Sequence, residues 1–111
     1  MFFFKLIEIN LSELPALING PFTPDLCNTL DSLPEMAREK DWPMDVSATL
    51  IGSCTNSSYE DMTRAADLCQ QAMDAGLKVK VPFLVTPGSE QVRATIEKDG
   101  IAEVFRKAGG M

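Results

Sequence analysis

The stretch VSATLIGSCTNSSYEDM, residues 46–62, contains the features that decide the fold. Its first part is largely apolar and ends in a glycine, which predicts a mostly buried strand over residues 46–52. Ser57 and Ser58 are each followed three residues later by an acidic residue, the pattern of a helix start with a capping box. The stretch therefore predicts a strand that turns directly into a helix, with Cys54 in the turn.

The residues that follow continue this alternation of strands and helices. Small and apolar residues recur at helical spacing from Met62 to Met73, and Gly76 supplies a helix stop. The further predicted elements are a strand at residues 79–86 bent by Pro82, a turn at 86–89, and helices at 90–98 and 101–107. This order implies two parallel strands joined by a right-handed crossover. A third strand should follow the last helix, so the unit looks unfinished.

The N-terminal part is rich in proline and turn-forming residues. An apolar and polar alternation predicts a short strand at residues 7–11, and a short helix is predicted within residues 30–40. The predicted fold class is therefore α/β: a partial three-layer α/β/α domain over residues 1–111. Within it, a loop-rich segment at residues 1–42 precedes a parallel βαβα unit at residues 43–111.

Composition excludes several classes of function. The net charge of −6 argues against nucleic-acid binding, and no apolar run is long enough to span a membrane. We find neither a secretory signal nor an organelle transit segment. Histidine is absent, which removes the commonest general base and zinc ligand. The three cysteines are widely spaced and odd in number, which favours a reducing compartment over a disulfide framework.

Two polar turns fall at the carboxyl ends of the predicted parallel strands, where α/β proteins place ligands. These turns are residues 52–58 and 86–89, and each precedes a helix N-terminus that favours anions. Cys54 is thus placed for metal ligation or nucleophilic chemistry, with Ser53 and Asn56 able to hydrogen-bond around it. The alternative is that Cys54 is only a small residue suited to a tight turn.

Three blocks of sequence carry a resemblance to a known family. They are INGPFTPDL at residues 18–26, GSCTNSSYEDM at residues 52–62, and TPGSEQVRATIE at residues 86–97. In their residues, order and spacing they resemble aconitases (aconitate hydratases), most closely the mitochondrial-type branch. The resemblance extends from about Leu6 to Gly110. It implies an internal fragment of the family's third domain that contains the first cluster-cysteine motif.

The resemblance implies a site and a cofactor. Aconitases interconvert citrate and isocitrate through cis-aconitate on a [4Fe–4S] cluster held by three cysteines. Cys54 matches the first of these metal ligands, and Ser53 and Asn56 would hydrogen-bond beside the cluster. The other two cysteines, and the family's catalytic residues, have no counterpart here. We therefore expect no catalytic residue in this chain, no cluster bound by the chain alone and no activity in isolation, although the parent family is a hydro-lyase.

The remaining expectations concern partners and other functions. The resemblance implies the remaining aconitase domains as partners and the mitochondrial matrix as location; otherwise the cytoplasm is expected. Open strand edges and the apolar Phe2-Phe3-Phe4 start predict self-association or a marginally stable monomer. The alternative function is a non-catalytic module that binds a small anion at its helix N-termini or simply bears a thiol. Cys69 is expected to be a buried structural thiol and Cys27 to have no role.

Overall fold

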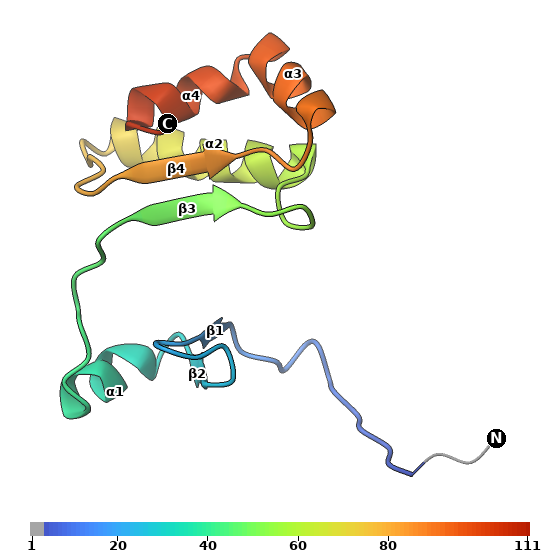
Figure 1. The fold of residues 1–111 in the computed structure, drawn as a ribbon, viewed down its shortest axis with the longest axis vertical. Coiled ribbons are helices and arrows are strands. Elements are labelled where there is room, and N and C mark those ends of the chain that lie inside the picture. The colour runs from blue at the N-terminus through green and yellow to red at the C-terminus, as the bar shows by residue number, and fades with distance from the viewer. Residues whose placement is uncertain (1–3) are drawn as a thin grey trace. The chain divides into compact units, whose positions relative to one another are not determined.

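The computed structural model describes residues 4–111, so Phe2 and Phe3 of the predicted apolar cluster lie outside the described residues. The described residues form two compact units that divide between Asp45 and Val46. In Figure 1 the first unit runs from blue to teal, and the second runs from green to red. Among residues 4–111, no helix combines the length and the apolar character needed to cross a membrane.

The first unit contains a hairpin and one short helix. Strands β1 (Leu17–Asn19) and β2 (Cys27–Thr29) pair antiparallel, and α1 (Leu33–Glu39) lies within the range predicted for a helix. The prediction of a strand at residues 7–11 is wrong, because these residues form no strand. Alternation of apolar and polar residues makes a strand only where a partner strand accepts its hydrogen bonds, and none lies there.

The hairpin forms where turn residues bring its two strands together. Gly20 adopts a φ of +98°, and its N–H donates to the carbonyl of Leu26 at 2.8 Å. The side chain of Asn28, which is buried, donates to the carbonyl of Gly20 at 2.8 Å. A residue other than glycine would be strained at this φ, so Gly20 fixes the start of the loop.

The second unit has the predicted order of strand, helix, strand and two helices. Its elements are β3 (Thr49–Gly52), α2 (Tyr59–Asp74), β4 (Phe83–Thr86), α3 (Glu90–Lys98) and α4 (Ile101–Ala108). Strands β3 and β4 are parallel and pair Thr49 with Phe83 through Gly52 with Thr86. Both strands are shorter than predicted, since pairing begins where the N–H of Thr49 donates to the carbonyl of Pro82.

Three helices pack on one face of this sheet. The core consists of Met62 and Ala66 from α2, Phe83 from β4, Ile96 from α3 and Phe105 from α4. Figure 1 shows α2, α3 and α4 gathered beside β4. A chain that advances across a parallel sheet in one direction through right-handed crossovers places its helices on one face. The sheet and one helical layer of the predicted three-layer domain are therefore present.

The other face of the sheet is uncovered within this unit. Leu50 and Leu84 are register partners, and they remain 60% and 42% exposed. Successive side chains of a strand point to opposite faces, so these leucines lie opposite the face that carries Phe83. The prediction of a mostly buried strand at residues 46–52 is therefore wrong for this unit, because burial on the second face requires a layer that α2, α3 and α4 do not supply.

In place of the third strand that we expected to be missing, residues 110 and 111 form only a short bridge to β4. Gly110 forms a parallel bridge with Phe83, and the N–H of Met111 donates to the carbonyl of Phe83 at 2.9 Å. The carbonyl of Met111 accepts the N–H of Val85 at 2.9 Å. These bonds use the edge of β4 opposite β3, so residues 110 and 111 extend the pairing of the two-stranded sheet on that side.

Candidate functional site

The candidate site is the Cys54 loop, residues 53–57, which joins β3 to α2. Cys54 is exposed, and its Sγ lies 3.7 Å from the hydroxyl oxygen of Thr55. The loop leaves the carboxyl end of β3, the position predicted from the sequence. An exposed thiol at such a strand end can reach a ligand from outside the unit.

Ser53 holds the loop through its side chain. Its hydroxyl oxygen accepts the backbone N–H of Asn56 at 2.6 Å and that of Thr55 at 3.2 Å. Both bonds curl the backbone around Cys54, so the hydroxyl of Ser53 shapes the loop in addition to any contact with a ligand. Asn56 is exposed beside it and takes part through its backbone N–H.

Ser57 and Ser58, at the junction of the loop and α2, have different roles, although both match the same capping pattern in the sequence. Ser58 caps α2: its Oγ accepts the N–H of Asp61 at 3.2 Å, and the Asp61 carboxylate accepts the N–H of Ser58 at 3.1 Å. Hydrogen bonds from the side chain and backbone of Ser58 lower the pKa of Asp61. Ser57 is completely buried instead, and its Oγ accepts the N–H of Ser53 at 2.7 Å.

The turn after β4 packs against the Cys54 loop. The N–H of Gly88 donates to the carbonyl of Ser57 at 3.0 Å. Ser89 then caps α3, since its Oγ accepts the N–H of Val92 at 3.1 Å. The two strand-end turns predicted from the sequence are therefore in direct contact, as expected for neighbouring parallel strands.

Neither of the other two cysteines lies in this loop. Cys27 is exposed on β2 of the first unit. Cys69 is partly buried on α2 against the core, and this burial raises the pKa of its thiol. Among residues 4–111, no three histidine, cysteine or acidic side chains come together in a group able to hold a metal ion. Of the three cysteines, only Cys54 lies in the loop at the carboxyl end of β3, where its thiol is exposed.

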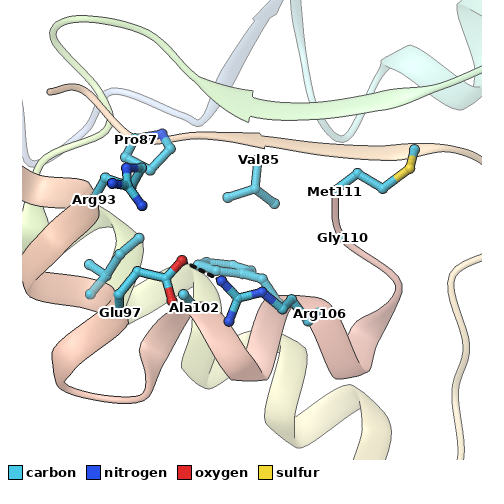
Figure 2. A pocket seen from close by; sticks show the side chains of 10 residues that line it. Val85, Pro87, Arg93, Glu97, Ala102, Arg106, Gly110 and Met111 are labelled. Atoms are coloured by element: carbon cyan, nitrogen blue, oxygen red, sulfur yellow. Dashed lines mark hydrogen bonds and ion pairs between the residues drawn. The ribbon is translucent and has the colours of Figure 1, made fainter. Parts of the chain in front are cut away.

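A separate cavity of about 150 Å³ lies between β4 and the helices α3 and α4. Figure 2 shows Glu97 and Arg106 on one side of it and Val85 and Met111 on the other, with Arg93 beside Pro87. Glu97 pairs with Arg106, and Glu90 pairs with Arg93. Because both arginines already have carboxylate partners and the Cys54 loop does not line this cavity, it adds no anion site to the loop.

The helix N-termini also bear on the alternative of anion binding. Glu60 and Asp61 lie in the first turn of α2, and Glu90 lies in the first turn of α3. Glu60 and Glu90 pair with Arg64 and Arg93, so the charge that opposes a small anion is that of Asp61, at the start of α2.

The second unit is a parallel α/β unit with an exposed cysteine at the carboxyl end of a strand. It belongs to the class of α/β proteins, which bind ligands at the carboxyl ends of their strands. The sequence model of the Aconitase family (aconitate hydratase) matches residues 1–111. The chain belongs to the aconitase family.

Relatives in other organisms agree with this assignment. A probable mitochondrial aconitate hydratase of Caenorhabditis elegans is 61% identical over 107 residues, which are 96% of this chain and 14% of the relative. A mitochondrial aconitate hydratase of Schizosaccharomyces pombe is 55% identical over 107 residues, which are again 96% of this chain and 14% of the relative. A mitochondrial homocitrate dehydratase of Saccharomyces cerevisiae is 56% identical over 95% of this chain and 13% of the relative. The chain thus spans about a seventh of the length of these relatives.

Proposed function

We propose that this chain is the part of a mitochondrial aconitate hydratase that supplies one thiolate, that of Cys54, to a [4Fe–4S] cluster. The observation that carries the proposal is the exposed Cys54 at the carboxyl end of β3, in a chain of the aconitase family. When bound, the cluster supplies a Lewis acid for removing and adding water on citrate and isocitrate. The mitochondrial assignment rests on the similar aconitate hydratases of C. elegans and S. pombe, which are mitochondrial proteins by name.

The chain's own contribution is to hold the thiolate at a defined place. Ser53 hydrogen-bonds the loop backbone around Cys54, and its hydroxyl together with the side chain of Asn56 is proposed to contact the cluster's sulfur atoms. A single thiolate is fewer than the cluster needs. We therefore propose that the remaining ligands come from the family's CxxC pair in a later segment of the enzyme, and that the 111-residue chain alone is not catalytic.

The substrate is proposed at the level of a hydroxylated tricarboxylic acid, with citrate first. A homocitrate dehydratase matches this chain about as well as an aconitate hydratase does, at 56% and 55% identity. Residues that separate citrate from homocitrate are therefore expected elsewhere in the enzyme.

A chimaeric enzyme tests the role of Cys54. The residues of this chain replace the matching stretch of the C. elegans relative, and the variants Cys54→Ser, Cys27→Ser and Cys69→Ser are made in the chimaera. We expect Cys54→Ser alone to lose the iron–sulfur visible absorbance and citrate dehydration, since only that thiol is exposed at the strand end. A Cys54→Ser chimaera that keeps its cluster absorbance would exclude the proposed ligand.

Anaerobic reconstitution tests the isolated chain. With ferrous iron and sulfide, the 111-residue chain is expected to form no stable four-iron cluster, because a four-iron cluster is normally held by several cysteines. A stable four-iron spectrum accompanied by citrate dehydration would overturn the proposal that other segments complete the ligand set.

A further inference from the structure

Ser57 is buried at the base of the Cys54 loop, although it takes no part in capping α2. Its exposed fraction is 0%, whereas Ser58 forms the capping box with Asp61. The Oγ of Ser57 accepts the N–H of Ser53 at 2.7 Å. A bond from residue 53 to residue 57 closes the backbone on both sides of Cys54. This buried hydroxyl therefore determines the width of the loop.

Ser57 also joins the loop to the neighbouring strand end. Its carbonyl accepts the N–H of Gly88 at 3.0 Å. A Cβ added at Gly88 would lie 3.0 Å from the carbonyl oxygen of Ser57 and 3.4 Å from that of Ser53. The turn after β4 can approach the Cys54 loop this closely because residue 88 has no side chain.

We propose that Ser57 is the positioning residue of the site: its buried hydroxyl, together with the contact to Gly88, fixes the loop that presents the Cys54 thiolate. This proposal rests on the proposed function only in taking the Cys54 thiolate as a cluster ligand; the role of Ser57 in holding the loop does not depend on it. Ser57 is fully buried, so it would act through the backbone of residues 53–57 and not by direct contact with a ligand. Because Gly88 lies in the turn that directly follows β4, that turn supports the loop through its hydrogen bond to Ser57. A ligand held by packing and hydrogen bonds before the cluster arrives loses less freedom on binding.

The variants Ser57→Thr and Ser57→Val distinguish the loss of the hydroxyl group from the effect of a larger side chain. Threonine and valine have nearly the same shape, so both meet the same crowding at this buried position, but only threonine keeps the oxygen that accepts the N–H of Ser53. Hydrogen exchange of the Ser53 amide is measured in the full 111-residue chain. We expect Ser57→Val to exchange roughly tenfold faster than Ser57→Thr at this amide, since a buried N–H without an acceptor is costly. The amide of Ala66 in the interior of α2 reports global unfolding and should not show this difference.

The unmodified chain provides a second test that does not depend on the variants folding. The N–H of Ser53 has a buried acceptor, whereas within residues 4–111 the N–H of Cys54 has no acceptor within hydrogen-bond distance. We expect the Ser53 amide to exchange at least roughly tenfold more slowly than the Cys54 amide. Equal rates for the two amides, or equal Ser53 rates in Ser57→Thr and Ser57→Val, would overturn the positioning role.

The effect on the cluster is measured in the chimaera described above. Cluster release to an iron chelator, followed by visible absorbance, should be several times faster with Ser57→Val than with Ser57→Thr. If Cys54→Ser retains the cluster, the proposed ligand is wrong while the exchange results still decide the role of Ser57 in the loop. If Cys54→Ser loses the cluster and the two Ser57 variants release it equally, the ligand stands and the positioning role fails.

Discussion

Truncation of one core aromatic ring should unfold the second unit. Phe105 is only 3% exposed, and its ring meets that of Phe83 edge-on, with centroids 6.2 Å apart and planes at 70°. Replacing a buried phenylalanine by alanine costs about 3–5 kcal/mol, which includes the loss of the aromatic pair. At roughly 0.05–0.15 kcal/mol per residue, the whole unit of residues 46–111 has a stability of about 3–10 kcal/mol.

The low end of that range applies here, because the core of the unit consists of five buried side chains and one face of its sheet is uncovered. The loss caused by Phe105→Ala is therefore comparable with the entire stability. In urea, a domain of this size has a slope of about 1 kcal/mol per molar, so a stability of about 3 kcal/mol corresponds to a midpoint of about 3 M, and the Phe105→Ala unit should be unfolded in buffer.

Far-UV circular dichroism during urea unfolding measures this change, since α2, α3 and α4 lie in the affected unit. The control is Phe22→Ala, the same change at a ring that is 82% exposed in the first unit. It should leave the helical transition in place. If Phe105→Ala and Phe22→Ala melt alike, the packing described for the core is wrong.

Three further predictions concern acid stability, thiol reactivity and association. Asp61→Ala should reduce the loss of stability between about pH 6 and about pH 3, measured by urea midpoints. The lowered pKa of Asp61 means that its contribution is present above the unfolded pKa near 3.9 and is lost as the pH falls through the folded value; an unchanged pH profile would contradict the cap. Iodoacetamide should label Cys54 before Cys27, and it should label Cys69 last because burial raises the pKa of the Cys69 thiol. Mass spectrometry gives the order of labelling, and equal rates for the three thiols would contradict the prediction. If the chain self-associates, Leu84→Lys on the uncovered sheet face should lower its sedimentation coefficient at high concentration, and an unchanged value would remove this face from the contact.

Much of the second unit could be predicted because its signals are local. The cap of α2 at Ser58, the positive φ of Gly76 beyond its end, and the bounds of α3 follow from residues within four positions of one another. The resemblance in three sequence blocks predicted the family that the comparisons then showed. The position of Cys54 at a strand end also followed from the order of the elements.

Tertiary structure decided the features that depend on distant partners. Residues 7–11 alternate as a strand should, yet the hairpin forms at β1 and β2, where Gly20 and Asn28 close a loop. Strand pairing depends on a second segment, which periodicity in one segment cannot identify. The parallel pairing of Met111 with β4 is of the same kind.

Local sequence signals were thus sufficient to predict the order of elements in the second unit, the caps of α2 and α3 and the placement of Cys54. Only the tertiary structure separated two adjacent serines with the same local pattern: Ser58 caps α2, whereas Ser57 is buried and accepts the N–H of Ser53. The physical reason is that a cap is completed by the next turn of its own helix. The burial of Ser57 arises from the approach of Gly88, which belongs to the turn after another strand.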